Sequence, residues 1–139
     1  MIKIENQKIC IIVSIYNKDI TFNTLKLAKT ALSEENINKI DILKVPGAFE
    51  IPVAISKLIK KYDGFIAIGC VIKGETNNFD LICKSITDGI MRLSIDNSKP
   101  IGNALITVFN KSQAEKRLKK GYAAARAVID VLKNGPEKI

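Results

Sequence analysis

Several short segments carry residue types that could bind a small molecule with a phosphate group or a flat ring. Gly74, Glu75 and Thr76 combine a glycine, where backbone N–H groups could close on a phosphate, with a hydroxyl that adds a donor. Tyr16 and Phe49 are aromatic residues whose rings could cover a flat heterocycle. These residue types predict a site for a phosphorylated or heterocyclic compound, provided that the fold brings them together.

Each of these residues also has a simpler explanation. Gly74 could be an ordinary turn glycine, followed by a helix N-cap at Thr76, Asn77 or Asn78. The two aromatic rings could pack over a sheet edge, and Glu50 could do no more than stabilise a helix dipole. The local sequence leaves both explanations open, so the choice depends on where the elements place these residues.

Strands and helices alternate along the chain. Four apolar runs predict strands, at residues 9–13, 40–45, 65–72 and 104–108. Helical patterns follow the first three strands, and the segment after the fourth predicts one or two further helices. Pro52 is expected in the first turn of the second helix, and Asp19 or Thr21 is the expected cap of the first. This order predicts an α/β fold, a three-layer flavodoxin-like sandwich with a central four-stranded parallel sheet.

A parallel sheet of this kind binds ligands at the carboxyl ends of its strands, where helix N-termini offer unpaired N–H groups. That rule selects four turns, at residues 14–17, 47–50 and 74–78 and in the segment after Thr107. The first three turns contain all the residues singled out above. Their convergence on one edge of the sheet favours a functional site over separate structural explanations.

Composition predicts one domain in a reducing compartment. A chain of 139 residues with 47% hydrophobic residues fits a single compact domain, residues 1–139. Its three cysteines lie in apolar runs without C-x-x-C spacing, which argues against a disulfide framework or a zinc site. The sequence shows no signal segment, and no stretch approaches the roughly 20 apolar residues that span a bilayer. We expect a cytoplasmic protein without a bound metal.

The basic balance of the chain could indicate nucleic acid, an anionic membrane surface or an acidic substrate as partner. The net charge is +8, from 22 Lys and Arg against 14 Asp and Glu. The positive charges are scattered as singles and pairs, and no basic strand carries the aromatic residues that stack on bases. This distribution favours a solvated surface or a phosphorylated substrate over nucleic acid or membrane. Arg117, beside Lys119 and Lys120, would by default belong to such a solvated face.

Three segments together resemble the 6,7-dimethyl-8-ribityllumazine synthase family, the riboflavin synthase beta-chain family. They are residues 12–17 (IVSIYN), 45–52 (VPGAFEIP) and 69–76 (GCVIKGET), and the similarity runs in order along nearly the whole chain. The resemblance implies a transferase that performs the penultimate step of riboflavin biosynthesis. It would condense 5-amino-6-(D-ribitylamino)uracil with 3,4-dihydroxy-2-butanone 4-phosphate through imine formation, phosphate elimination and ring closure, with no metal or organic cofactor.

The same resemblance implies an assembly. Members of the family form pentamers with sites between neighbouring subunits, and some pentamers build icosahedral shells. We therefore expect a homopentamer or a higher assembly, with riboflavin synthase as a candidate partner. Met1 to Lys8 would add an edge strand to a neighbouring subunit, which would cover an exposed sheet edge.

Roles for the substrate-binding residues follow from the resemblance, one residue at a time. Tyr16 matches the residue that stacks on the uracil, and Glu50 matches the carboxylate that binds ribityl hydroxyls. Ala48 and Phe49 belong to the same ribityl-binding segment. The segment beside the pyrimidine corresponds to Val71 and Ile72.

The phosphate-binding residues follow in the same way. Gly74, Glu75 and Thr76 match the phosphate loop, and Arg117 matches the arginine that pairs with the phosphate across a subunit boundary. A guanidinium binds two phosphate oxygens at once, with a geometry that an ammonium cannot match. Lys120 is the counterpart of a conserved family lysine, in a stretch that is shortened in this chain. The resemblance thus implies a catalytic set of Arg117, Lys120 and Asn78, which stands at the position of the usual histidine.

Two positions depart from the family pattern. Asn78 stands where the family usually has histidine, and the chain contains no histidine at all. An amide cannot take up a proton, whereas a general base typically contributes about 10²- to 10⁴-fold in rate. Water, the substrate's phosphate or Glu75 are the remaining proton acceptors. Asn103 stands where many members have phenylalanine beside the uracil, and its amide could instead hydrogen-bond to the heterocycle.

These departures leave two hypotheses. The first is an active enzyme that is slowed by the missing histidine and works largely by positioning, for which effective molarities reach roughly 10⁵ M. The second is a catalytically impaired family member that acts as a ligand-binding or shell-forming scaffold. Retention of Glu50, Thr76 and Arg117 favours the first, because a scaffold needs none of them.

Overall fold

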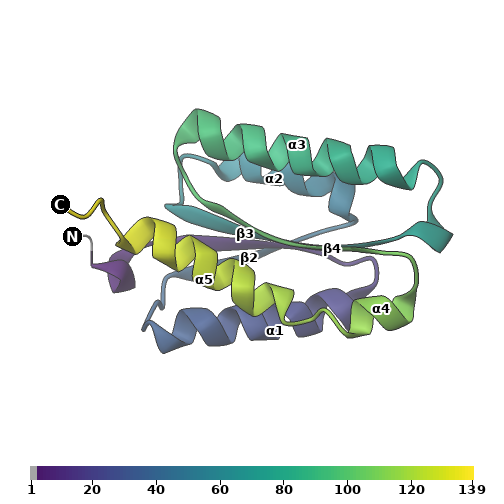
Figure 1. Cartoon of the computed structure of the whole chain (residues 1–139), viewed down its shortest axis with the longest axis horizontal. Helices are drawn as coiled ribbons and strands as arrows, with labels where there is room; N and C mark the ends of the chain where they lie inside the picture. Colours follow the sequence, from purple (N-terminus) through teal and green to yellow (C-terminus); the bar gives the residue numbers. More distant parts are fainter. Residues whose placement is uncertain (1–2) are drawn as a thin grey trace.

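The structure is a computed structural model that describes residues 3–139, and it shows three layers (Figure 1). The central layer is a parallel sheet with strand order β2-β1-β3-β4. Its strands are β1 (Ile9–Ser14), β2 (Ile40–Val45), β3 (Gly64–Ile72) and β4 (Ile101–Val108). The predicted α/β fold with a central four-stranded parallel sheet is therefore confirmed.

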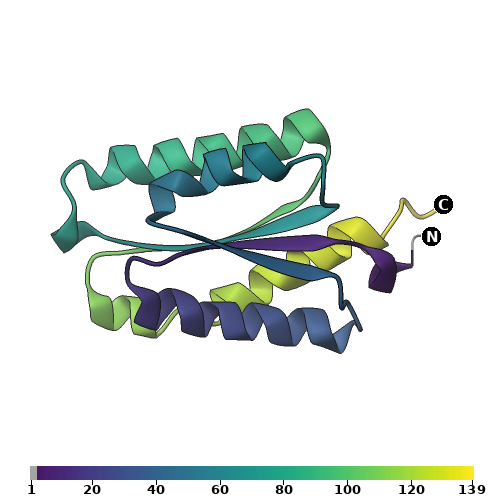
Figure 2. The ribbon, with the colours of Figure 1, turned by 180° about the vertical axis from the view of Figure 1, so that it is seen from behind.

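Helices cover both faces of the sheet, as the view from behind also shows (Figure 2). One face carries α2 (Ile51–Leu58) and α3 (Phe79–Asn97). The other face carries α1 (Lys18–Glu34), α4 (Lys111–Glu115) and α5 (Lys120–Lys133). Three short 3-10 helices complete the described chain: Ile4–Asn6, Ala48–Glu50 and Lys73–Glu75.

The apolar runs form strands because their side chains have a core to enter on each face. Along β1, Ile11 and Val13 enter the cluster under α1 and α5, while Cys10 and Ile12 enter the cluster under α2 and α3. Every residue of β1 and β3 is buried. β2 lies at an edge of the sheet and is mostly exposed. The two central strands thus fix the layers, and the turns that follow them are held in place.

The start of α1 differs from the prediction. The helix begins at Lys18, and its N-cap is Asn17 in the left-handed conformation with φ of 60°, so the expected cap at Asp19 or Thr21 was wrong. The Thr21 hydroxyl instead donates to the Ser14 carbonyl at 2.6 Å, which ties the helix to the end of β1. The Asp19 carboxylate forms an ion pair with Lys111 of α4. Pro52 lies in the first turn of α2, as predicted.

The N-terminal segment turns within the described residues. Ile4 to Asn6 form a 3-10 helix, and the Ile4 side chain is buried in the cluster under α1 and α5. Met1 and Ile2 lie outside the described residues. Addition of residues 1–8 to a neighbouring sheet stays a prediction, and it would require this turn to unwind.

Replacement of Gly121 by alanine is expected to destabilise the fold. A Cβ on Gly121 would lie 2.2 Å from the Thr24 carbonyl oxygen, so α5 could no longer approach α1 this closely. Overpacking of this kind typically costs about 1–3 kcal/mol, which outweighs the helix propensity of about 1 kcal/mol that alanine gains over glycine. Urea unfolding measures the change. Gly135→Ala is the matched control, because a Cβ there meets nothing within 4 Å, and equal stability of the two variants would contradict the prediction.

Candidate active site

The turns after β1 and β2 lie side by side at the carboxyl edge of the sheet. Backbone hydrogen bonds join them, from Ile15 N to Val45 O at 2.8 Å and from Tyr16 N to Pro46 O at 3.0 Å. The Tyr16 side chain is 58% exposed, so its ring does not pack over the sheet edge. A shallow pocket beside it is lined by Ile15, Tyr16, Asn17, Lys18, Asp19 and Pro46. The ring is thus available to cover a flat ligand.

The segment from Gly47 to Glu50 has a fixed shape. The Gly47 N–H donates to Glu50 Oε1 at 2.9 Å, which holds the half-buried carboxylate beside the start of α2. Ala48 is buried against Gly69 of β3, where an added Cβ would lie only 2.9 Å from the Ala48 Cβ. Phe49 is 63% exposed, and together with Glu50 it lines a pocket with residues of α2 and α3. The backbone bond occupies one carboxylate oxygen and leaves the other able to accept from a ligand hydroxyl.

The loop after β3 is open. Residues 73–75 form an exposed 3-10 turn, and the Thr76 hydroxyl donates to Asn77 O at 3.2 Å. Gly74 has no positive φ, and the nearest heavy atom to a Cβ placed on it is Phe109 O at 4.0 Å. Neither backbone conformation nor crowding within the chain therefore requires glycine here. The open space at Gly74 fits the close approach of a ligand to the backbone.

Val71 and Ile72 reach this edge through their backbone alone. Both side chains are buried, at 9% and 4% exposure. The pairing of β3 with β1 ends at Ile68, so the last four residues of β3 extend past this pairing. A ligand on that side would meet the peptide groups of Cys70 and Ile72, because those of Val71 face β4.

Asn17 connects two of the turns, and the sequence argument had not selected it. Its Nδ2 donates to Glu75 Oε2 at 3.3 Å and to the Cys70 carbonyl at 3.5 Å. The Asn17 amide therefore holds the Glu75 carboxylate at the loop after β3. The sequence signal for its backbone, though not for these contacts, was an asparagine in the turn between a buried strand and a helix, since asparagine adopts the left-handed conformation more readily than most residues.

Asn78 lies at the start of α3. It is the N-cap of that helix, with φ of 57°, and its exposed side chain makes no capping hydrogen bond. The N-cap that the local sequence had left open among three residues is thus Asn78. Its amide is free to face a ligand, and the left-handed backbone also accepts histidine, which is enriched there as asparagine is.

A second group of predicted residues lies at the other side of the sheet, along the free edge of β4. Phe65 N donates to Pro100 O, so the even-numbered peptide groups of β4 face β3 and the odd-numbered ones face outward. Asn103 is exposed on this strand, and Lys120 donates from Nζ to the outward Leu105 carbonyl at 2.5 Å. In one chain this edge is separated from the turn of β1 by β3.

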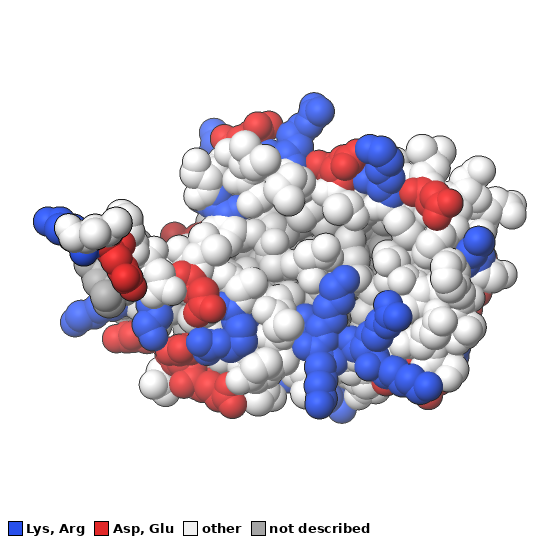
Figure 3. All heavy atoms as spheres, in the orientation of Figure 1, with Lys and Arg blue, Asp and Glu red and all other residues white. Residues whose placement is uncertain are grey.

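Arg117 lies in the turn between α4 and α5, and its side chain is exposed. Figure 3 shows basic side chains gathered where α4 passes into α5, below an uncharged hollow that runs between α3 and α5. Burial, and then the nearby Arg117 charge, lower the pKa of Lys120. The structure therefore brings Arg117 and Lys120 together near the free edge of β4, whereas Tyr16 follows β1 and Glu50 lies at the start of α2.

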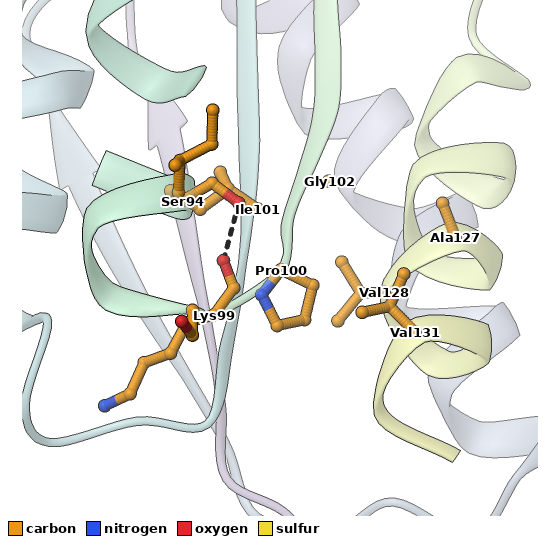
Figure 4. Close-up of a pocket in the computed structure, with 10 residues that line it drawn as sticks. Ser94, Lys99, Pro100, Ile101, Gly102, Ala127, Val128 and Val131 are labelled. Atoms are coloured by element: carbon orange, nitrogen blue, oxygen red, sulfur yellow. Dashed lines mark hydrogen bonds between the residues drawn. The ribbon is translucent and has the colours of Figure 1, made fainter. Parts of the chain in front are cut away.

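A pocket at the amino end of β4 contains none of the predicted residues (Figure 4). Its walls are mainly apolar and come from the end of α3, the start of β4 and the second half of α5. Pro100, Val128 and Val131 line it, and the Ser94 hydroxyl donates to Lys99 O at 2.7 Å beside it. The pocket lies next to the free edge of β4.

Three properties of residues 3–139 concern thiols, metal ions and membranes. Burial raises the pKa of Cys70, the cysteine nearest the site, to about 11, which keeps this thiol protonated at neutral pH. No three His, Cys, Asp or Glu side chains in the described range group closely enough to hold a metal ion. None of the helices in that range is long and apolar enough to cross a bilayer.

Comparison with known proteins identifies the family. Residues 6–134 match the family described as 6,7-dimethyl-8-ribityllumazine synthase. Relatives that carry that name include a Limosilactobacillus reuteri protein, 36% identical over 88% of this chain and 83% of its own. The Polaromonas protein is 40% identical over 76% of this chain and 69% of its own. The Thermococcus kodakarensis protein is 33% identical over 91% of this chain and 85% of its own. The chain belongs to the 6,7-dimethyl-8-ribityllumazine synthase family.

Proposed function

We propose that this protein is an active 6,7-dimethyl-8-ribityllumazine synthase, a transferase of riboflavin biosynthesis. Its substrates are 5-amino-6-(D-ribitylamino)uracil and 3,4-dihydroxy-2-butanone 4-phosphate. Family membership supports the activity, and the observation that carries it is the set of three turns at one sheet edge. These turns supply an exposed ring at Tyr16, a fixed carboxylate at Glu50 and an open phosphate loop at Gly74.

The first substrate binds at the turns after β1 and β2. The uracil stacks on Tyr16, and the ribityl chain lies along Ala48 and Phe49 with its hydroxyls on the free oxygen of Glu50. Val71 and Ile72 lie beside the pyrimidine, and the Ile72 backbone hydrogen-bonds to it, because the Val71 peptide groups already pair with β4 and both side chains are in the core. This arrangement fixes the amino group of the uracil that will attack the ketone.

The phosphate of the second substrate binds at Gly74, Glu75 and Thr76, with the guanidinium of Arg117 from a neighbouring subunit. The open backbone at Gly74 and the Thr76 hydroxyl support this assignment. Asn103, at the same free edge as Arg117, contributes its amide Nδ2 beside the heterocycle. Its Oδ1 already accepts a hydrogen bond from Leu105 N.

The reaction consists of imine formation with loss of water, elimination of inorganic phosphate, and ring closure with loss of a second water. No metal or organic cofactor takes part. Protons move between the substrates and acceptors other than histidine, namely water, the departing phosphate and Glu75. The Asn17 bridge holds Glu75 at the phosphate loop, which supports its part in this transfer. Most of the rate comes from holding the two substrates together.

We propose a homopentamer, or a larger assembly of pentamers, with each site shared by two subunits and with riboflavin synthase as a further partner in the cell. The support is the split of the site residues between the turns after β1 to β3 and the free edge of β4. The apolar pocket at the amino end of β4 adds a surface suited to subunit contact. Light scattering after gel filtration tests the assembly, and a stable 15.3 kDa monomer would contradict it.

We also infer that residues 1–139 form one lumazine synthase domain that works in the cytoplasm, without nucleic acid or a membrane as partner. The single sheet with core on both faces supports one domain. All three cysteines are free, which fits a reducing compartment.

The decisive experiment incubates the purified protein with both substrates and follows the lumazine product by chromatography. Product formation above the uncatalysed background is the expected result. A ribityl-pyrimidine that binds tightly without any turnover would instead identify a scaffold. Absence of both binding and turnover would contradict the proposed function altogether.

A further inference from the structure

The free edge of β4 is closed at one point by two side chains from opposite faces of the sheet. The Leu105 side chain enters the cluster under α2 and α3, and Asn103, two residues earlier, shares that face. Lys120 belongs to α5, which packs on the other face. Asn103 Oδ1 accepts from Leu105 N at 3.0 Å, and Lys120 Nζ donates to Leu105 O at 2.5 Å.

This clasp, defined as Asn103, Leu105 and Lys120, satisfies both outward peptide groups of Leu105. An edge strand normally presents such groups to any strand that can pair with it. A neighbouring strand therefore cannot extend along β4 past Leu105 without displacing one of the two side chains. This part of the edge is therefore left to contacts with side chains and ligands rather than to pairing with another strand.

Lys120 also holds the turn that carries Arg117. Its backbone N–H donates to Arg117 O at 3.0 Å, while its side chain reaches the Leu105 carbonyl. The half-buried Lys120 side chain thus connects the backbone of Arg117 to the edge of β4. The guanidinium itself is exposed, so its position depends on the backbone that carries it.

We propose that Lys120 is a positioning residue. Its ammonium, bound to the Leu105 carbonyl, fixes the turn between α4 and α5 so that Arg117 is held ready for the substrate phosphate. The part that concerns the phosphate rests on the proposed function. The part that concerns the edge of β4 does not, because every contact of the clasp lies within one chain.

The first test compares steady-state kinetics of three variants. Lys120→Met keeps the stem and removes the ammonium, and it is expected to raise KM for the butanone phosphate about tenfold, with kcat and the KM for the uracil changed less than about threefold. Lys120→Arg can still donate to a carbonyl and should restore most of the loss. Lys119→Met, at an exposed neighbour with no side-chain partner among residues 3–139, is the matched control and should match the parent protein.

The second test needs no substrate. Hydrogen exchange of the peptide that covers β4 is expected to be faster in Lys120→Met and in Asn103→Ala than in the parent protein or Lys119→Met. Unchanged exchange in Lys120→Met would overturn the clasp, and an unchanged KM for the phosphate substrate would overturn the positioning role. If the parent protein formed no lumazine, the proposed function would fail while the exchange data still decided the clasp.

Discussion

Arg117→Ala is expected to lower kcat/KM for the butanone phosphate roughly 10- to 100-fold, because charge-assisted hydrogen bonds to phosphate are lost. Most of the effect should appear in KM for that substrate, since the proposed uracil site lies at other turns. Fold and assembly should persist, because the Arg117 side chain is exposed. Steady-state kinetics with each substrate varied in turn measure the change.

Two further variants sharpen this prediction. Arg117→Lys keeps the charge but loses the bidentate hydrogen bonding of a guanidinium to phosphate, so its KM should lie between those of the parent protein and the alanine variant. Lys116→Ala removes one positive charge from the adjacent exposed position and controls for general electrostatic attraction. An equal loss in Lys116→Ala would show that the local field, rather than a specific contact at Arg117, attracts the phosphate.

Asn78→His is expected to raise kcat by about 10²-fold, because it supplies the imidazole base that the chain lacks. The left-handed backbone at Asn78 accepts histidine, so the fold should tolerate the change. A general base acts in its neutral form, so the rate of this variant should increase with pH up to the imidazole pKa, about 6.5 in a solvated position, and then level off. The rate of the parent protein should not show this increase with pH, and pH–rate profiles of both proteins provide the comparison.

The matched control is Asn77→His, which places the same imidazole one residue earlier in the same exposed loop. It should give neither the gain in kcat nor the new pH dependence. If Asn78→His leaves kcat unchanged, proton transfer does not limit the rate, and the site works by positioning alone.

β1 and β3 could be predicted because their apolar side chains are buried on both faces of the sheet. β1 and β2 begin where the apolar runs begin, whereas β4 begins at Ile101, three residues before its predicted start. Gly102 and Asn103 break the apolar pattern there, and the strand forms through backbone pairing with β3. The pattern of side chains shows burial, but it does not show where backbone pairing ends.

Helix starts were harder to predict for a similar reason. The cap of α1 at Asn17 depends on a left-handed backbone, and the sequence pattern points equally well to Asp19 or Thr21. The Thr21 hydroxyl has a different partner, the carbonyl of Ser14, which only the packing of α1 against β1 brings within reach. Local propensity could not distinguish a Thr21 hydroxyl that caps the helix from one that donates to the Ser14 carbonyl.

The candidate site was predictable in part. One rule about parallel sheets selected the turns that contain Tyr16, Glu50 and Gly74, and the structure places them at that edge. Arg117 could be selected only through the family resemblance, because it belongs to a different edge of the subunit. The Asn17 bridge and the Lys120 contact depend on side chains that meet across elements, and sequence spacing contains no signal for either.

The division of the site residues between two sides of the sheet has a genetic consequence. If each site takes Glu50 from one subunit and Arg117 from the next, a Glu50→Ala chain damages one half of the shared site and an Arg117→Ala chain damages the other half. Mixed assemblies of the two defective proteins would contain some interfaces with both halves intact, and these would regain activity by intragenic complementation. A chain that carries both substitutions would rescue neither single variant, because each interface that it forms has at least one damaged half.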